Sequence, residues 1–465
     1  MSKLTKQHDE TTRLGTQSIT KLLFIFSLPA IASNVAWAIY NIIARIFIGR
    51  FVDEAALGGL ALSLPVIMFA MGIPTLLGVG SANLISIRLG EKRKEPAEAT
   101  ANHCILLSIF AGVAILILGF VFIEPLLSIL GAQEGSESLA YARIYISIIL
   151  FGFPLQFIGL AISNIIRAQG YPTAAMIGIL VHVAVNIALQ YPLVYSTRLG
   201  IAGSAWALVI SHAAMLVWYI VFLSIKKLTL RLTPFRFKLS LKAMGSIVIF
   251  GSSQAVAQFA LGFVLVFFNE RASFFGAREL VSEHGGDIAL SGMTIAQTIS
   301  MIIVMIVFGL STGAQPILGY NHGAGNFKRV MQTYRTAVVF ASITAAAGFV
   351  LMFFFAEHLV SLFIPDGSDV LVDFSGKAVR GISIGLPVIG FQIVSANYFV
   401  ATGRPKTSLF LSLLRQVILL IPVIYIAGEL RGLMGVVLSG PIADILSSVV
   451  TAIVIVYVIR NRKFG

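Results

Sequence analysis

Few side chains in this sequence could do chemistry, and the most informative of them stand inside long apolar segments. Asp444 is the deepest acid, because it lies about eleven residues into the apolar stretch 433–459. A helix rises about 1.5 Å per residue, so this carboxyl group is expected roughly halfway along such a helix. It could bind a proton or attract a cation. It could equally be the structural partner of a basic residue, with Arg415 as the candidate, and both interpretations stay open.

Beside Asp444, we single out three ionisable side chains that lie deep within apolar stretches. Arg415 lies in the stretch 407–428, His182 in 173–197 and His212 in 201–225. A histidine can change its charge near neutral pH. For both histidines, however, we favour hydrogen bonding to a neighbouring helix. For Arg415 we favour an ion pair within the bundle or a side chain that extends to the membrane interface.

Neutral polar side chains in the same stretches could line a cavity. In the first half of the chain the candidates are Asn34, Tyr40, Asn41, Asn164, His182, Asn186 and Gln190. In the second half they are Gln254, Gln297, Gln315, Gln392 and Asn397. The competing interpretation is hydrogen bonding between helices, which is the usual role of Asn and Gln in membranes.

Motifs for several other chemistries are absent from the sequence. There is no GxxxxGK[ST] phosphate-binding motif, no HExxH metal motif and a single cysteine, Cys104. We therefore expect no cofactor, no bound metal, no disulfide within the chain and no ATP hydrolysis. A membrane enzyme acting on lipids would need a cluster of acids or histidines near an interface, and Asn321 with His322 is a poor substitute. We expect a protein that is not an enzyme.

The elements that position these residues are membrane-spanning helices. Hydrophobic residues make up 57% of the 465 residues and charged residues only 11%, against about 25% in soluble domains. The stretches Ala55–Ile87, Ala168–Thr197 and Ile288–Phe327 contain no Asp, Glu, Lys or Arg. A bilayer span needs about 20 mostly apolar residues, and backbone groups in lipid must be satisfied within the segment, which makes each span a helix.

We predict an all-α integral membrane protein with twelve transmembrane helices in two pseudo-symmetric six-helix lobes. The expected spans are 20–48, 57–88, 99–123, 139–166, 173–197, 201–225, 243–269, 288–318, 336–357, 380–401, 407–428 and 433–459. The segment before the first span is polar and the apolar run after it is too long for a signal peptide, so the first span is expected to remain.

The formal net charge of +13 reflects orientation in the membrane and does not indicate a nucleic-acid partner. With twelve spans, 23 of the 33 basic residues fall on the side that holds both termini: Lys3, Lys6, Arg13, Lys21, Arg88, Lys92, Arg93, Lys94, Arg167, Lys226, Lys227, Arg231, Arg236, Lys238, Lys242, Lys328, Arg329, Arg335, Arg404, Lys406, Arg460, Arg462 and Lys463. Acidic residues gather in the opposite loops. Basic loops stay in the cytoplasm, so we expect both termini there, in a multi-pass protein of the cell (inner) membrane.

The two halves of the chain repeat one another. At an offset of 233 the matching residues are Gly80 and Gly313, Gly90 and Gly323, Glu124 and Glu357, Ser128 and Ser361, Gly152 and Gly385, Pro154 and Pro387, Gly170 and Gly403, Pro172 and Pro405, and, among the ionisable side chains, His182 and Arg415. At a second offset, shorter by one, they are Gly200 and Gly432, Gly203 and Gly435, and His212 and Asp444. One offset held across separate regions favours duplication over chance.

The repeat divides the chain into an amino-terminal lobe, residues 1–225, and a carboxy-terminal lobe, residues 243–465, joined by a cytoplasmic linker, residues 226–242. Six spans per repeat bring both halves in from the same side of the membrane. Transporters built in this way bind substrate near the midplane between their repeats and alternate access by rocking motions. Such a transporter holds both lobes in one chain, and we expect a monomer surrounded by membrane lipids.

Several segments resemble the multidrug and toxic compound extrusion (MATE) family. The segment 308–324, FGLSTGAQPILGYNHGA, with Asn326 and Arg329, resembles the family's eighth span. Further similar stretches are Ser27–Pro29, Tyr40–Ile43, Ile46–Gly49, Gly78–Gly90, Ala401–Pro405 and Gly440–Asp444. The resemblance covers nearly the whole chain. It implies a cation-coupled antiporter with two lobes around a central cavity, which exports amphipathic and often cationic compounds.

Two departures from the family pattern concern its ion site. An aspartate usually stands where this chain has Ala44, and another where it has Gln190. Alanine cannot bind a proton or a sodium ion, and glutamine offers only a neutral carbonyl oxygen. Asn41 and Gln190 remain the leading cavity candidates because they flank or occupy these positions. Asp444 is the remaining candidate for ion coupling.

The resemblance and the repeat together predict a secondary active antiporter that exports small organic compounds, drugs or metabolites, in exchange for protons or sodium. A lipid-linked sugar flippase is one alternative. Such flippases tend to carry several basic residues in the cavity, and Arg415 is the one clear basic residue deep in a span. A second alternative is a transporter-like protein whose ion coupling has been lost or relocated, which the residues at positions 44 and 190 keep open.

Overall fold

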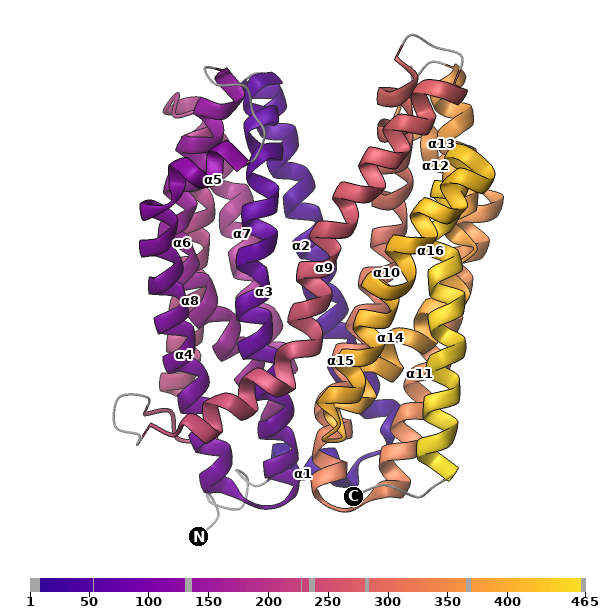
Figure 1. Ribbon diagram of the computed structural model, residues 1–465. Coiled ribbons are helices and arrows are strands. Elements are labelled where there is room, and N and C mark those ends of the chain that lie inside the picture. Colours follow the sequence, from indigo (N-terminus) through magenta and orange to yellow (C-terminus); the bar gives the residue numbers. More distant parts are fainter. Residues whose placement is uncertain are drawn as a thin grey trace. The chain divides into compact units, whose positions relative to one another are not determined.

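The computed structural model describes residues 9–52, 54–129, 136–226, 228–233, 239–280, 284–364 and 369–460. Within these ranges almost every residue is helical and no strand occurs (Figure 1). This follows from the composition, because apolar segments in a bilayer satisfy their backbone hydrogen bonds only within themselves. The predicted all-α fold is confirmed.

The long helices follow the predicted spans. In the first half they are α2 (Ile19–Phe51), α3 (Glu54–Gly90), α4 (Lys94–Val121), α6 (Glu137–Ala168), α7 (Pro172–Gln190) and α8 (Ile201–Ile225). In the second half they are α9 (Leu241–Glu279), α10 (Gly285–Gly323), α11 (Phe327–Phe354), α13 (Asp369–Ser383), α14 (Leu386–Ala401), α15 (Pro405–Leu413) and α16 (Leu420–Arg460). Shorter elements are α1 (Asp9–Thr16), α5 (Ile123–Ile129), α12 (Ala356–Ser361) and two π-helical segments, η1 (Tyr191–Ser196) and η3 (Leu414–Leu419).

Two irregularities reconcile these helices with twelve spans. Helices α13 and α14 are bent by 46° at a short break and together form one span. The stretch from α15 through η3 into α16 holds two spans, because α16 changes direction at Gly432, whose φ of 58° and ψ of −140° are not helical. With α7 continuing into η1, the described residues contain twelve spans, as the hydropathy pattern predicts.

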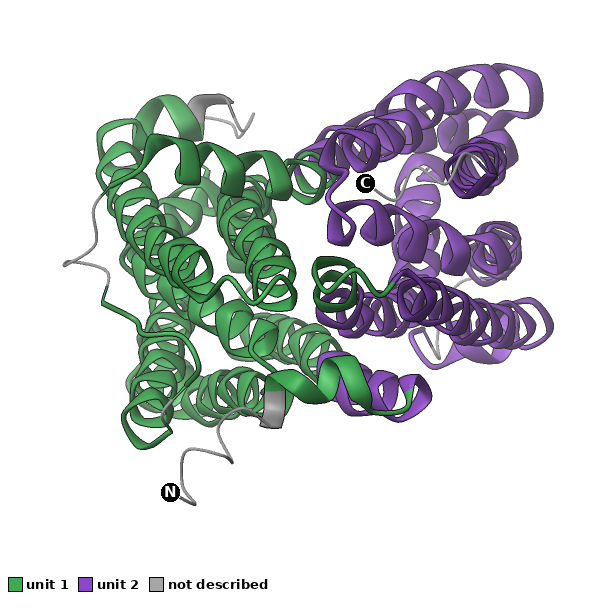
Figure 2. Ribbon diagram, turned by 90° about the horizontal axis from the view of Figure 1, so that it is seen from below, with its two compact units in different colours: residues 1–18, 32–258, 319–326 green, residues 19–31, 259–318, 327–465 purple. Residues whose placement is uncertain are grey.

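The described residues form two compact units (Figure 2). Unit 1 takes those within 1–18, 32–258 and 319–326, and unit 2 takes those within 19–31, 259–318 and 327–465. Helices α2, α9 and α10 each contribute to both units. Two of them have a proline close to the change, Pro29 in α2 and Pro316 in α10, and proline weakens a helix at that point. The predicted lobe boundaries come from the sequence repeat, whereas the two units come from contacts in the structure. The lobe boundaries therefore stay a prediction.

Each unit has its own apolar core. In unit 1, α6 packs against α3, α4 and α8, and its buried face includes Ile146, Phe153 and Phe157 (Figure 1). In unit 2, α14 packs against α11 and α16, and α13 against α16. Fully buried side chains of this size are close-packed, so each unit can hold polar side chains in fixed positions.

The backbone carries the same repeat as the sequence. Positive φ angles occur at Lys92 and Gly325 (60° and 69°) and at Gly170 and Gly403 (98° and 77°), two pairs that match at the first offset. They also occur at Gly200 and Gly432 (56° and 58°), which match at the second. Helix breaks match too: α4 ends before Phe122 and α11 before Phe355, with nearly equal φ angles of −106° and −110°. The predicted duplication is therefore a structural one.

The described parts of the predicted linker, within 226–242, are held to unit 1 by side chains that accept its backbone N–H groups. Gln169 accepts from Leu230, Glu98 from Arg231, Asn102 from Thr233 and His103 from Ser240, with distances between 2.7 and 3.0 Å. Residues 227 and 234–238 lie outside the described ranges. The linker thus forms part of unit 1.

Candidate functional site

Asp444 and Arg415 meet inside unit 2. Arg415 lies in the π-helical segment η3, and its Nε donates to Oδ1 of Asp444 on α16 at 2.5 Å. The Asp444 side chain is 6% exposed and that of Arg415 is 31% exposed. The structural partner that the sequence suggested for Asp444 is therefore present. A buried carboxylate needs such a partner, because an unpaired buried charge costs several kcal/mol.

A glycine on α14 makes room for this ion pair. Gly385 is the N-cap of α14, and a Cβ at that position would lie 3.1 Å from Oδ2 of Asp444 and 2.9 Å from Cα of Pro441. Next to the pair, Gln392 donates to the hydroxyl of Ser447, which donates to the backbone carbonyl of Asp444 at 3.1 Å. The carbonyl oxygen of Gln392 is buried without a hydrogen-bond partner. The ion pair thus stands within a wider polar cluster.

The corresponding cluster of unit 1 consists of aromatic rings. The imidazoles of His182 on α7 and His212 on α8 stack with centroids 4.6 Å apart and an interplanar angle of 10°. Tyr40 on α2 meets His182 edge-on at 5.3 Å, and Trp37 meets Tyr40 at 5.4 Å. Both histidines are buried, at 1% and 3% exposure. Neither ring nitrogen of His182 has a hydrogen-bond partner, and neither has Nδ1 of His212.

A polar stripe continues along α7 from His182. Asn186 and Gln190 follow at intervals of four positions, which places them on the same helix face. Gln190 donates to the amide oxygen of Asn186 at 3.1 Å, and its own carbonyl oxygen is buried without a partner. Ala44, the other position where the family has an acid, is partly buried on α2. The π-helical segment η1 begins directly after Gln190.

The two clusters occupy equivalent positions of the repeat. His182 and Arg415 match at the first offset, and His212 and Asp444 at the second. Gly152 lies against His212, where a Cβ would be 3.4 Å from Nδ1, as Gly385 lies against Asp444. Two stacked rings in one half thus take the place of an ion pair in the other.

A second matched pair involves Asn164 and Asn397. Asn397 donates to the hydroxyl of Ser311 on α10. Asn164 lies against Gly78 on α3, where a Cβ would be 2.6 Å from its Nδ2. Gly78 and Ser311 themselves match at the first offset. The sequence did not single out Ser311, Ser447 or Gly385 as contacts, and the repeat offset does not indicate Ser311, because its equivalent is a glycine.

The remaining predicted site residues make other contacts, and Asn41 adjoins the side chain of Tyr40 in the aromatic cluster. The amide of Asn41 donates to the carbonyl of Trp37 in its own helix at 2.8 Å. Gln254 was expected in the second half of the molecule and lies in unit 1, because the first part of α9 packs on α3 where Gly251 meets Gly80. Asn34 and Gln297 are partly buried, and Gln315 is buried.

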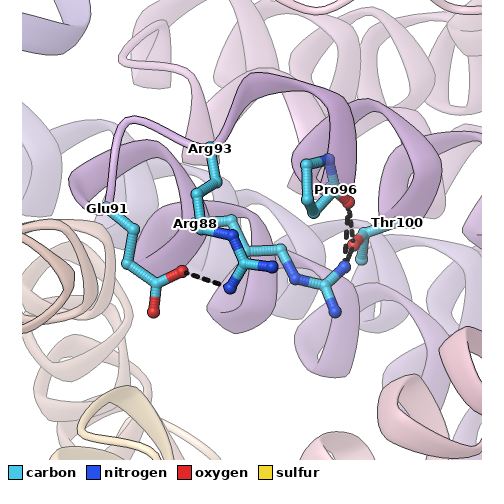
Figure 3. Close-up of polar contacts among 5 residues, drawn as sticks. All are labelled: Arg88, Glu91, Arg93, Pro96 and Thr100. Atoms are coloured by element: carbon cyan, nitrogen blue, oxygen red, sulfur yellow. Dashed lines mark hydrogen bonds and ion pairs between the residues drawn. The ribbon is translucent and has the colours of Figure 1, made fainter.

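The basic turn after α3 is organised by hydrogen bonds. Figure 3 shows Arg88 extending to the start of α4, where it donates to the carbonyl of Pro96 at 2.8 Å and to the hydroxyl of Thr100. Arg93 pairs with Glu91 at 3.4 Å, in an exposed position where an ion pair contributes little. Arg88 therefore ties α3 to α4 and is separate from both polar clusters.

Comparison with known proteins identifies the architecture. The model of the MatE family matches residues 29–192 and 263–426, one stretch in each half of the repeat. The multidrug export protein MepA of Staphylococcus aureus (strain MRSA252) is 26% identical over 444 residues, covering 96% of this chain and 95% of MepA. MepA of Staphylococcus haemolyticus is 27% identical over 445 residues, with the same coverage.

Solved structures share the fold. An outward-facing multidrug resistance MATE family transporter of the MOP superfamily superimposes with a TM-score of 0.88 at 23% identity, over 95% of this chain and 96% of the other. A MOP superfamily transporter from Pyrococcus furiosus gives 0.88 at 22% identity with the same coverage. The family match extends over both halves of the repeat, and the chain belongs to the MatE family of multidrug efflux transporters.

Proposed function

We propose that this protein is a secondary active antiporter that exports small amphipathic, often cationic organic compounds in exchange for protons or sodium. Its membership in the MatE family and its similarity along the whole chain to proteins named multidrug export protein support the direction and the substrate class. The loop charges support an orientation with both termini in the cytoplasm.

The observation that carries the proposal is the ion pair between the buried Asp444 and the partly buried Arg415. Antiport requires a group that binds the coupling ion with different affinity in two helix arrangements, because an ion with equal affinity for both shifts neither. A proton or sodium ion on Asp444 competes directly with the guanidinium at 2.5 Å. Arg415 belongs to a π-helical segment, and such segments are frequent at functional sites. Release of Arg415 would therefore act on the helix that holds it.

The proposal predicts that Asp444→Asn abolishes ion-dependent transport and leaves the fold intact. Asparagine keeps the size and hydrogen bonding of the side chain but cannot bind a proton at neutral pH. The measurement is efflux of a fluorescent cationic dye from proteoliposomes with imposed proton or sodium gradients, with melting temperature as the check on folding. Gradient dependence that survives in this variant would refute the assignment of Asp444.

A companion variant, Ala44→Asp, addresses the alternative that coupling has been lost. Gradient-driven efflux by the unaltered chain would show that coupling operates without the family's two acids. Efflux only after the aspartate is restored would mean that the chain is an uncoupled form of an exporter. The comparison is specific because position 44 lies on α2 in unit 1, whereas the Arg415–Asp444 pair belongs to unit 2.

A further inference from the structure

We propose that the stacked His182–His212 pair is a proton-binding site of unit 1, in which one of the two imidazoles carries the proton, in the half of the molecule that lacks the family's acids. The inference rests on the proposed antiport for its role in transport. Proton binding itself can be tested independently.

The first argument is unused hydrogen-bonding capacity. Each neutral imidazole has one ring nitrogen that donates and one that accepts, and buried polar groups are normally satisfied. Three of the four ring nitrogens in this pair have no partner, although both side chains are more than nine-tenths buried. Packing alone does not require histidine here, since an apolar ring would fill the same space without unsatisfied nitrogens. The pair therefore has ring nitrogens that are not used by the packing and can take up a proton.

The second argument is that the pair can hold one proton but not two. The ring centroids are 4.6 Å apart, and two positive charges at this distance within a low-dielectric interior repel strongly. Interacting groups of this kind titrate as a unit. The pair is thus limited to one proton, which gives a defined stoichiometry.

The third argument concerns the groups around the pair, and among those that the structure describes no carboxylate contacts either ring. Tyr40 on α2 is the titratable group that contacts His182, and Tyr145 on α6 interacts with Tyr40. Arg45 on α2 interacts in turn with Tyr145. A proton on the imidazoles is therefore not bound to a fixed counter-ion in the described packing, and its affinity depends on the neutral groups that surround it.

Those neutral groups come from three helices. On α8 the backbone of Ser211 faces the ring of His182, and on the α6 side His212 faces Gly152, which carries no side chain. On α7 itself Asn186 and Gln190 follow along the same face, and the carbonyl oxygen of Gln190 is unpartnered. Carbonyl and amide oxygens can accept from an imidazolium N–H without adding a charge.

These surroundings link proton uptake to helix arrangement. In the packing shown, neither ring nitrogen of His182 has a hydrogen-bond partner in good geometry, although the backbone of Ser211 lies close to the ring. Burying a charge without well-formed hydrogen bonds is costly. A rearrangement that brings a backbone carbonyl, an amide oxygen or water to the ring would remove that cost. The π-helical segment η1 directly after Gln190 offers a place for such a change. A proton would then favour one arrangement over another, as coupling requires.

The fourth argument is the repeat. The equivalent residues in unit 2, Arg415 and Asp444, are also in contact and form an ion pair. Both halves thus place a pair of ionisable side chains at the same two positions. In unit 2 the pair is neutral overall when both side chains are charged, whereas in unit 1 the pair is neutral without a proton and carries one positive charge with it.

The direct test is nuclear magnetic resonance of full-length protein with ¹³C-labelled histidine, titrated from mildly alkaline to mildly acidic pH. The variants His182→Gln and His212→Gln assign two of the signals, and the exposed His358 serves as an internal reference. We expect the His182 and His212 signals to shift together, with uptake of about one proton for the pair, and each single variant to change the midpoint of the remaining signal. If neither signal moves across this pH range, the proposal is wrong.

Transport provides the second test. We expect the variants His182→Gln and His212→Gln to lower proton-driven dye efflux by a factor within about 5 to 150, the usual range of coupling between two sites, and His358→Gln to leave it unchanged. If both glutamine variants keep full proton-driven efflux, the pair is not a coupling site, although the antiport proposal stands. If the unaltered protein shows proton uptake by the pair but neither proton-driven nor sodium-driven efflux, the antiport proposal fails and the proton site stands.

A double variant separates the loss of proton binding from a loss of folding. His182→Arg combined with His212→Asp places the ion pair of unit 2 at the equivalent positions of unit 1 and supplies partners for both side chains. We expect this variant to fold, to lack the titrating histidine signals and to lose proton dependence. Proton-driven efflux that persists in it would contradict the role of the histidines.

Discussion

At the scale of single residues, the functional clusters depend on small side chains as much as on polar ones. Gly385 and Gly152 stand at equivalent positions and give space to Asp444 and His212. Both lie in helical or near-helical backbone, so an alanine could adopt the same backbone conformation. What differs between them is the space available to a methyl group, and this difference can be measured.

We predict that Gly385→Ala destabilises the protein, whereas Gly152→Ala is close to neutral. At Gly385 the added Cβ would lie 2.9 Å from the backbone of Pro441 and 3.1 Å from Asp444, while at Gly152 its nearest neighbours are at 3.3 and 3.4 Å. Overpacking lowers the stability of the folded protein by about 1–3 kcal/mol. The higher helix propensity of alanine raises this stability by up to about 1 kcal/mol. Thermal unfolding in detergent checks this. Equal melting temperatures for the two variants would contradict it.

At the scale of elements, breaks in helices do as much positioning as the helices themselves. Gly432 divides the last 41-residue helix into two spans, and Gly200 begins α8 in the same backbone conformation. After Gly432 the carboxylate of Glu279 accepts from the N–H of Leu433, with both oxygens at 3.1 Å. An acid at a helix N-terminus satisfies free N–H groups there. The break thus sets the direction of the helix that carries Asp444.

We expect Gly432→Ala to be more harmful than Gly200→Ala. Both substitutions place an alanine in a conformation that costs about 1–3 kcal/mol. At Gly432 the new methyl group would also collide with the carboxylate of Glu279, whereas at Gly200 the nearest atom is 3.5 Å away, in Val52. The measurement is the melting temperature of each variant together with proton-driven efflux. A smaller effect at Gly432 than at Gly200 would show that the cap by Glu279 is unimportant.

At the scale of the whole molecule, the segment between the two repeats belongs to unit 1. Four side chains of unit 1 accept its backbone N–H groups: Glu98, Asn102, His103 and Gln169. Asn102 also donates to the carbonyl of Arg231 at 3.1 Å, so its side chain both accepts a hydrogen bond from the segment and donates one to it. A linker held in this way moves with unit 1.

We predict that Asn102→Ala speeds amide hydrogen exchange in residues 228–233 by about tenfold, because losing hydrogen bonds worth about 1 kcal/mol each favours local opening. Ser224→Ala is the matched control, since that hydroxyl bonds to the carbonyl of Ile220 in its own helix. Exchange followed by mass spectrometry checks the result. Unchanged exchange in the Asn102 variant would mean that the remaining acceptors hold the segment alone.

The sequence by itself determined the membrane class, the twelve spans, the duplication and the family resemblance. Most of these features depend on residues that are close together in the sequence. A long apolar stretch is enough to predict a span, and the positive φ at Gly170, Gly403 and Gly432 is a backbone conformation that glycine adopts readily. The repeat offset is a property of residue order alone. The loop charges predict an orientation, which stays a prediction.

Only the tertiary structure decided which polar residues meet. The sequence left Asp444 open between an ion site and a partner of Arg415, and it gave no contact for His182, because a contact depends on the rotation and spacing of neighbouring helices. Packing around Gly385 and Gly152 brought Asp444 to Arg415 and His212 to His182. Packing likewise placed Gln254 in unit 1 and bound the linker there. The depth of a side chain in the membrane depends on its position along one helix, whereas a contact between two side chains depends on how two helices pack.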